Sequence, residues 1–328
     1  MSVRNIALII AAGCLVAACG KKDGDVSAEA TTAEPTATAV ATALPEQITI
    51  NTPGFLPEGV EYDTLNKRFL VGSIAQGTVF VVGEDGALTP FIQDPDLKSS
   101  IGIEVDEERN RLLVANSDGA VFQGQPGQAK LGIYQLDTGE RIAMVDLAAA
   151  GPTGAKAHFA NDIAVGPDGS AYVTDSMARV VYKVDANNVA SVFLPDPSKG
   201  GPYMLNGIAA HPSGYLVVAE STAGDLYKVP LDKPEAVSKV KLPEAMNGAD
   251  GILWHGNGNL LVVRNDASNS IYALSSTDDW ATANVAAKGT YAVQATTAAV
   301  AGDDVYVVHP HFGDPAAAPF IERVTLAP

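Results

Sequence analysis

A repeating order of polar and apolar positions runs six times through residues 57–309. Each copy opens with a short, mixed-polarity motif, continues into an apolar run, turns, and ends in a second apolar run. In the second half of the chain the copies start about 45 residues apart, and the opening positions are Glu58, Ile101, Asn161, Asn206, Asp250 and Ala295. A unit of this length holds several strands but cannot bury both faces alone, so neighbouring units must stack. The pattern predicts an all-β protein, a six-bladed β-propeller.

The turns inside the copies support this prediction. Segments such as 166–170, 211–214 and 256–259 are rich in Gly, Pro, Asn, Asp and Ser, which supply the backbone conformations of hairpin turns. The apolar runs between them are short and mostly do not alternate, as expected for strands covered on both faces. A ring must also close, because an open last blade would expose strand edges. We expect the isolated strand at residues 47–50 to complete the sixth blade beside residues 320–326.

The first 45 residues do not contain the repeated pattern. Residues 1–18 have the basic start, apolar stretch and small residues of an export signal, and Val16-Ala-Ala-Cys19 resembles the bacterial lipobox, whose cysteine is acylated. Cys14 follows small residues less favourably, and an ordinary cleaved signal is the alternative. Residues 19–45 have almost no large apolar side chains and predict a disordered tether, and we expect residues 46–328 to form the propeller. The resemblance implies a lipid-anchored protein of the bacterial envelope, on the outer membrane and facing the periplasm.

The amino-acid composition limits the classes of molecule that this protein is expected to bind. The formal net charge is −17, which disfavours nucleic acid and anionic surfaces. The two cysteines both lie in the N-terminal segment, so the propeller has neither disulfides nor thiolate metal sites. About 280 residues in one closed ring can bury a large core. We expect a monomer that contacts the membrane through its lipid anchor.

Four of the opening positions carry oxygen ligands. In a propeller the innermost strands start around one end of the central channel, so Glu58, Asn161, Asn206 and Asp250 should converge there. Two carboxylates and two carboxamides suit Ca²⁺ or Mg²⁺. The alternative is that these residues only form turns and satisfy backbone groups. Their shared phase in the repeat favours a site for one divalent cation.

The opening motifs at 57–59, 161–169, 205–208 and 249–252 resemble those of the regucalcin/gluconolactonase family (SMP-30-like) of six-bladed propellers and, more distantly, the paraoxonases. The resemblance implies that Glu58, Asn206 and Asp250 bind a divalent cation, with Ca²⁺ the first candidate and Mg²⁺ or Zn²⁺ the others. It implies that Asn161 binds substrate and that Asp250 also acts as a general base. The implied activity is metal-dependent hydrolysis of a lactone. A non-catalytic propeller that binds a small ligand or an envelope protein is the alternative.

Departures from the family pattern change the expected substrate. Gluconolactonase-like members often carry an arginine two residues before the substrate asparagine, whereas this chain has Phe159, so a less polar lactone or ester is expected. A histidine dyad of the paraoxonase type is absent from the start of the second repeat.

Other polar residues are secondary candidates on the same side of the ring. His158 is a possible proton shuttle, and Arg264 could orient an anionic substrate or pair with Glu220 or Asp250. The second apolar runs all end in polar residues, which predicts a solvated pocket mouth: Ser73, Asn116, Asp175, Glu220, Arg264 and His309. The Gly- and Gln-rich insertion at residues 118–130 predicts a lid, a partner contact or a passive loop.

Overall fold

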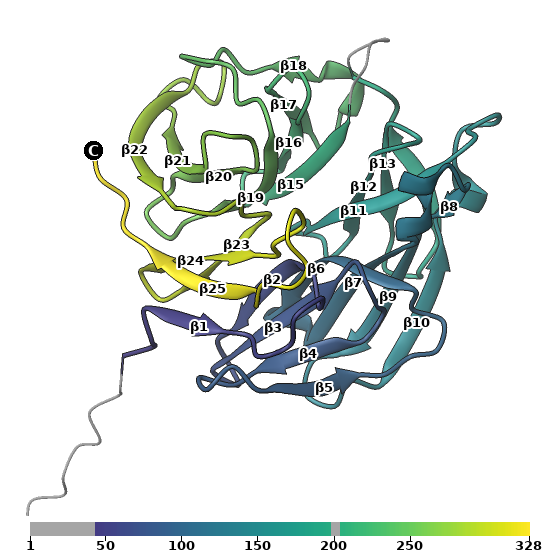
Figure 1. The fold of residues 1–328 in the computed structure, drawn as a ribbon. Helices are drawn as coiled ribbons and strands as arrows, with labels where there is room; N and C mark the ends of the chain where they lie inside the picture. The colour runs from purple at the N-terminus through teal and green to yellow at the C-terminus, as the bar shows by residue number, and fades with distance from the viewer. Residues whose placement is uncertain (1–42, 198–203) are drawn as a thin grey trace, which may run out of the picture. The chain divides into compact units, whose positions relative to one another are not determined.

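Six β-sheets arranged around a central channel confirm the predicted six-bladed propeller (Figure 1). The computed structural model describes residues 43–197 and 204–328, and the compact unit runs from Leu44 to Pro328. The predicted signal, the lipidation site Cys19 and nearly all of the tether lie outside the described residues. None of the helices in the described part of the chain is long and apolar enough to cross a membrane.

Each blade is a sheet whose innermost strand lines the channel, and consecutive strands pair antiparallel outward. The strands of blades one to three are β2 (Pro57–Asp63), β3 (Arg68–Ser73), β4 (Val79–Val82), β5 (Leu88–Ile92); β6 (Ser99–Asp106), β7 (Arg111–Ser117), β9 (Lys130–Gln135), β10 (Arg141–Asp146); and β11 (His158–Val165), β12 (Ala171–Asp175), β13 (Val180–Val184), β14 (Ala190–Leu194).

The strands of blades four and five are β15 (Leu205–His211), β16 (Tyr215–Glu220), β17 (Asp225–Pro230), β18 (Ser238–Lys239); and β19 (Ala249–Trp254), β20 (Leu260–Arg264), β21 (Ser270–Ser275), β22 (Asn284–Thr290). Blade six contains β23 (Ala298–Ala301), β24 (Asp304–His309) and β25 (Phe320–Val324). The described residues also form short 3-10 helices: η1 (Glu107–Arg109), η2 (Gly119–Gln123), η3 (Ala148–Ala150) and η4 (Pro234–Ala236).

The ring closes as the sequence predicts. The N-terminal strand β1 (Gln47–Thr49) pairs antiparallel with β25, with Ile48 opposite Ile321, and becomes the outermost strand of blade six. Ile48 and Ile50 are buried in the core between the last and first blades. Joining the two ends of the chain in one sheet covers the edge of β25 that would otherwise be open.

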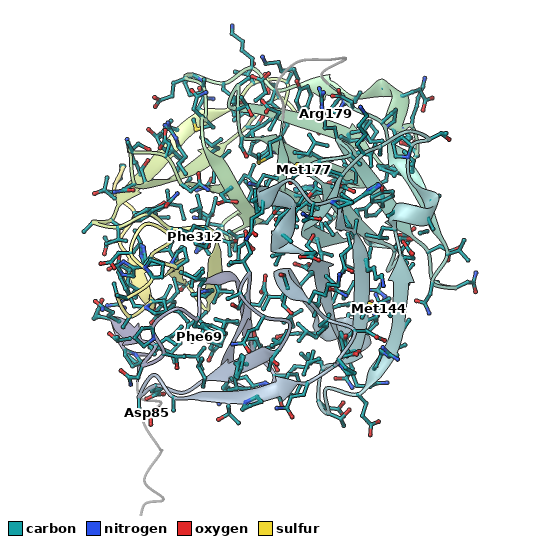
Figure 2. All side chains as sticks on the ribbon, turned by 45° about the vertical axis from the view of Figure 1, so that its right-hand side comes forward. Phe69, Asp85, Met144, Met177, Arg179 and Phe312 are labelled. Atoms are coloured by element: carbon teal, nitrogen blue, oxygen red, sulfur yellow. The ribbon has the colours of Figure 1, made fainter. Side chains whose placement is uncertain are left out.

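The core consists of six apolar clusters, each between two neighbouring blades. Figure 2 shows side chains filling the spaces between the sheets, with Phe69 between blades six and one and Met144 packed at the cluster between blades one and two. Strands covered on both faces explain why their apolar runs do not alternate. This packing holds the inner strands in fixed positions around the channel.

The insertion in the second repeat joins two blades. Residues 118–130 contain η2 and the short strand β8 (Gly127–Gln128), which pairs in parallel with the start of β11. Val121 and Ala129 are buried in the cluster between blades two and three. The segment therefore adds a fifth strand to blade three at the end of the channel where the inner strands begin.

Candidate functional site

A β-bulge at the start of the inner strand sets the direction of the opening residues. In blades one to five, the register between the first and second strands shifts so that two inner residues oppose one residue of the neighbouring strand. The two residues are the opening residue and the one after it, as in Glu58 and Gly59. A bulge re-aims side chains and is common beside functional sites. The shared phase seen in the sequence therefore corresponds to a shared backbone geometry.

Glycine follows the opening residue because the blades approach closely there. A Cβ on Gly59 would lie 2.4 Å from the carbonyl oxygen of Ile101, and one on Gly207 would lie 2.1 Å from the carbonyl oxygen of Asp250. No side chain fits at these distances, so only glycine permits the contact. This contact brings the opening residues of neighbouring blades towards the same axis.

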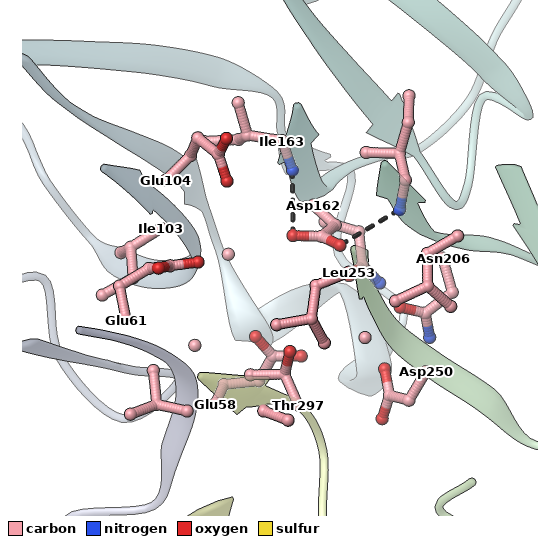
Figure 3. Close-up of a pocket in the computed structure, with 18 residues that line it drawn as sticks. Glu58, Glu61, Ile103, Glu104, Asp162, Ile163, Asn206, Asp250, Leu253 and Thr297 are labelled. Atoms are coloured by element: carbon pink, nitrogen blue, oxygen red, sulfur yellow. Dashed lines mark hydrogen bonds between the residues drawn. The ribbon is translucent and has the colours of Figure 1, made fainter. Parts of the chain in front are cut away.

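The four predicted oxygen ligands converge on one cavity. Glu58, Asn161, Asn206 and Asp250 all line a cavity of about 30 Å³ in the channel, together with Thr297 (Figure 3). Asn161, Asn206 and Asp250 are 6, 7 and 4% exposed. A water needs roughly 10–15 Å³ of such space, so the cavity has room for an ion and a water but not for a whole lactone ring.

Hydrogen bonds hold the side chains of three of these residues. Asn265 donates from Nδ2 to Oδ2 of Asp250, and Asn206 also donates to the same carboxylate. Asn161 donates from Nδ2 to Oγ of Ser176 over 2.9 Å, and Ser176 in turn donates to the carbonyl of Leu205. The amide of Asn161 therefore has a defined orientation, with its Nδ2 turned to Ser176.

The site has an excess of negative charge. Burial raises the pKa of Asp250 to about 7, and the charge of Asp162 adds to the effect, while the bonds from Asn265 and Asn206 oppose it. Burial, followed by repulsion from Asp250 and Asp162, raises the pKa of Glu58 well above its usual value. The charged groups that act on these two carboxylates are themselves carboxylates. Buried anions without a cationic partner are strongly destabilised in their charged form.

The donor set fits a hard divalent cation. Glu58 and Asp250 supply carboxylate oxygens, Asn206 supplies an amide oxygen, and all three border the same small cavity. Within residues 43–197 and 204–328, no three His, Cys, Asp or Glu side chains stand together so as to hold a metal. Amide oxygen and water would therefore have to complete the coordination, which suits Ca²⁺ better than Zn²⁺.

Sequence reasoning missed Asp162, which stands where blades one, two, four and five have glycine. Its carboxylate also borders the cavity and accepts N–H bonds from Ile163 over 2.9 Å and from Ile208 of the next blade over 3.1 Å (Figure 3). Burial raises the pKa of Asp162 to about 7, although these two bonds oppose the shift. The signal was present in the repeat, because Asn161 is followed by aspartate where Glu58, Asn206 and Asp250 are followed by glycine.

His158 does not line the cavity. Its Nδ1 lies 2.8 Å from Oδ2 of Asp175, and its side chain is 16% exposed. The hydrogen bond with Asp175 raises the pKa of His158 in spite of partial burial. The residue starts β11 beside β8 of the insertion. Its predicted role as a proton shuttle stays a prediction, and the structure places it among structural polar groups.

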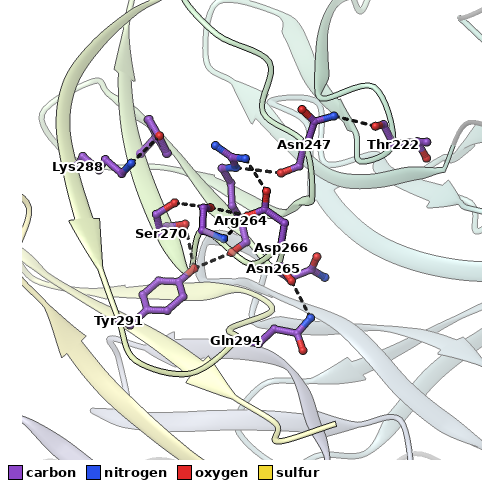
Figure 4. A network of polar contacts seen from close by, with 11 residues as sticks. Thr222, Asn247, Arg264, Asn265, Asp266, Ser270, Lys288, Tyr291 and Gln294 are labelled. Atoms are coloured by element: carbon purple, nitrogen blue, oxygen red, sulfur yellow. Dashed lines mark hydrogen bonds and ion pairs between the residues drawn. The ribbon is translucent and has the colours of Figure 1, made fainter. Parts of the chain in front are cut away.

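Arg264 is held by its own blade and its neighbour. Its Nε donates to the carbonyl of Asn247 over 2.9 Å, and its guanidinium pairs with Asp266 over 2.6 Å (Figure 4). It is 8% exposed and does not line the cavity of Asp250. The ion pair is with Asp266 rather than with Glu220 or Asp250. Its predicted contact with substrate stays a prediction.

The predicted solvated mouth is wrong. The polar residues that end the second strands are buried, and each has a polar partner in a neighbouring segment: Ser73, Asn116, Asp175, Glu220, Arg264 and His309. Glu220, for example, accepts N–H bonds from Met204, Thr222 and Ala223. These side chains satisfy backbone groups of the connecting loops, which is the other common use of polar residues at strand ends.

Solved structures with the same fold differ strongly in sequence. The Malassezia sympodialis allergen Mala s 1 aligns with a TM-score of 0.73 and 18% identity, covering 86% of this chain and 97% of the allergen. A gluconolactonase from Xanthomonas campestris aligns with a TM-score of 0.58 and 14% identity, covering 88% and 94%. A luciferin-regenerating enzyme aligns at 0.61 and 15%, covering 85% and 94%. At these identities the likeness establishes the fold alone.

Family membership comes from the sequence. No curated protein matches the chain at a significant level. The family model described as SMP-30/Gluconolactonase/LRE-like region matches residues 56–296, which span the first five blades and the approach to the sixth. This match confirms the resemblance carried by the opening motifs. The chain belongs to the SMP-30/Gluconolactonase/LRE-like family.

Proposed function

We propose that this protein is a lactone or ester hydrolase that uses one divalent cation held by Glu58, Asn206 and Asp250. Ca²⁺ is the first candidate, and Mg²⁺ and Zn²⁺ are the others. The observation that carries the proposal is the convergence of two carboxylates, on which only other carboxylates act as charges, and two amides on one small cavity. Membership in a family whose name includes gluconolactonase supports the reaction type.

Asp250 has the position and environment of a general base. The bound cation would supply a Lewis acid for the acyl oxygen of the substrate. Asp250 accepts a proton from water, whose oxygen forms a bond to the acyl carbon. The acyl carbon–oxygen bond of the lactone then breaks, and the proton passes from Asp250 to the departing oxygen. Asn265 donates to Oδ2 of Asp250, and Asn206 donates to the same carboxylate, so hydrogen bonds hold the proposed base in a fixed orientation.

The substrate must place little more than its carbonyl group in the cavity. A space of about 30 Å³ excludes a ring, so the rest of the substrate lies outside it. Asn161, oriented by Ser176, would bind the substrate beside the cation. The position two residues earlier is Phe159, which is buried and packs edge-on against Phe122 at 5.0 Å. Phe159 belongs to the core between blades two and three, so this position supplies no cationic group to bind sugar hydroxyls, which supports a lactone or ester less polar than a sugar lactone.

A panel of lactones and esters tests the proposal. The purified protein is assayed with δ-gluconolactone, alkyl-substituted lactones and aryl esters, before and after treatment with a chelator. We expect hydrolysis of the less polar substrates, its loss with chelator, and its recovery with Ca²⁺. If no substrate in the panel is turned over with any of the three cations, the protein is a non-catalytic propeller that binds a small ligand or an envelope protein.

We also propose that Cys19 is acylated after removal of residues 1–18, and that the propeller is anchored to the bacterial envelope on the periplasmic side of the outer membrane. The support is the order of a basic start, an apolar stretch and Val16-Ala-Ala-Cys19. Cys19→Ser should move the protein from the membrane to the soluble fraction, and Cys14→Ser should not. Unchanged membrane retention of Cys19→Ser would refute the anchor.

A further inference from the structure

The channel contains a second chamber beyond the cavity of Asp250. Three positions after the opening residues, the inner strands carry Glu61 in blade one and Glu104 in blade two. Both carboxylates border the first cavity and also a larger one of about 270 Å³ further along the strands. Three residues of strand span about 10 Å, so these glutamates lie well along the channel from Glu58. We call the larger cavity the distal chamber.

The distal chamber adjoins a second open cavity, which we call the groove. This cavity of about 430 Å³ shares Glu104, Val165 and Ala210 with the distal chamber as lining residues. The two spaces therefore lie side by side at these residues. Spaces of a few hundred Å³ with mixed walls are typical of small-molecule sites. A small organic molecule therefore has room to bind.

One wall of the chamber is acidic and the others are apolar. Glu61 and Glu104 come from adjacent blades, and Figure 3 shows them on one side of the channel, away from Asp250 and Asn206. The remaining lining is apolar or aromatic: Ala164, Val165, Ile208, Ala209, Ala210, Ile252, Leu253, Trp254 and Val300. A ligand that fits this chamber needs a positive end and an apolar body.

The two glutamates repel each other and have no positive neighbour acting on them. Burial, followed by repulsion from Glu104, Asp162 and Glu107, raises the pKa of Glu61 well above its usual value. Burial, followed by repulsion from Asp162, raises the pKa of Glu104 to about 8. A cation placed between two such carboxylates removes this repulsion. A primary ammonium carries three donors and can bond to both.

Trp254 provides the aromatic part of the wall. Its indole lies edge-on to Trp280 at 5.1 Å and to His211 at 4.8 Å. As part of the lining, Trp254 offers an apolar packing surface to the body of a ligand, and an aromatic face beside a cation adds attraction.

The wider groove also contains a positive group, Arg109. Its guanidinium pairs with Asp106 over 3.2 Å and with Glu108 over 3.3 Å. These pairs leave the groove without an uncompensated positive charge. They therefore do not oppose the entry of a cation.

We propose that the distal chamber binds a small organic ammonium ion, with its charged end between Glu61 and Glu104 and its apolar body against Trp254. A bare metal ion would leave most of a 270 Å³ space unfilled, and a neutral molecule would not relieve the repulsion between the carboxylates. The binding does not depend on hydrolysis at Asp250.

Intrinsic fluorescence and calorimetry with benzylammonium test the proposal on the full chain. The chain has two tryptophans, Trp254 and Trp280, which contact each other, so the emission reports directly on the chamber. Benzyl alcohol, which has the same ring and no charge, is the matched neutral probe. We expect benzylammonium to change the emission and to bind, and benzyl alcohol to bind at least about tenfold more weakly.

Variants locate the binding. Glu61→Gln and Glu104→Gln should each weaken benzylammonium binding about tenfold, and Trp254→Phe about two- to fivefold. Asp250→Asn at the other chamber and Asp232→Asn on the surface should leave it unchanged. Each variant is checked for an unchanged melting transition, and for any glutamine variant that does not fold, the alanine variant at the same position, which also lacks the charge, is used.

Three results would overturn the proposal. The first is equal binding of benzyl alcohol, which would make the chamber a simple apolar cavity. The second is loss of benzylammonium binding in Asp250→Asn but not in Glu61→Gln. The third is a Glu61-dependent response to Ca²⁺ alone at concentrations where benzylammonium gives none, which would make the chamber a metal site.

Discussion

Two sets of polar residues lie at the same end of the propeller, the opening residues of the inner strands and the residues that end the second strands. They differ in their hydrogen-bond partners. The opening residues Glu58 and Asp250 border a cavity and repel each other. The strand-end residue Glu220 is also buried, but it accepts backbone N–H bonds from the two connections beside it, over distances of 2.7 to 3.0 Å. Each set recurs at its own fixed position in the repeat. They differ in whether the backbone gives the side chain its partners.

This difference distinguishes polar residues that stabilise the fold from polar residues that form a candidate functional site. Loops that join blades leave N–H groups without partners, and a carboxylate at the end of a strand can satisfy several of them. The bulged start of an inner strand instead turns the side chain towards the channel. A polar position that repeats in the sequence therefore indicates a site only where no backbone donors are available to it. Three substitutions can test this rule.

The largest effect is expected for Glu220→Ala. The change removes three hydrogen bonds to a charged acceptor and leaves three backbone N–H groups without their acceptor, which should cost about 3 kcal/mol of stability. Thermal unfolding should show a fall in Tm of several degrees. Asp232→Ala, on an exposed loop, is the control. A Tm unchanged by Glu220→Ala would contradict the structural role of this set.

Asp250→Asn should act on chemistry instead of stability. The amide keeps the size of the side chain but loses the charge and the basicity, so turnover of the best substrate should fall about 10²-fold. The Tm should stay the same or rise, because a buried charge with a raised pKa is removed. Steady-state kinetics and thermal unfolding are measured on the same preparation. Full turnover by Asp250→Asn would place the base elsewhere.

The smallest effect is expected for Glu104→Gln, and it should depend on pH. Burial raises the pKa of Glu104 from the usual 4.5 to about 8, so the folded state holds this proton more tightly than the unfolded state. The contribution of Glu104 to stability therefore falls as pH rises from about 4.5 to about 8. Glu104→Gln should raise the Tm by at least about 2 °C at pH 9 and change it little at pH 4.5.

The exposed Glu140 is the matched control for that experiment. Glu140→Gln should leave the Tm unchanged at both pH values. A lower Tm for Glu104→Gln at pH 9 would mean that the ionised carboxylate is stabilised by a partner in the chamber, contrary to the charge distribution seen here.

The sequence by itself determined the architecture. Six copies of one strand pattern fixed the number of blades, and the isolated strand at residues 47–50 fixed how the ring closes, because each blade needs neighbours on both faces. It also selected Glu58, Asn161, Asn206 and Asp250, because a repeat converts an equal phase into an equal position around the axis. The structure brings these four residues together.

Only the tertiary structure decided which other polar residues face the channel. The bulge adds one residue to the inner strands of blades one to five and shifts their alternation. The positions of Glu61 and Glu104 could therefore not be predicted from a simple period of two. The burial of the strand-end set depends on N–H groups supplied by loops whose paths the repeat does not specify. The sequence pattern repeats from one blade to the next. The hydrogen-bond partners of a buried polar group, however, come from neighbouring segments, so only the packing of the blades and loops decides which partners it has.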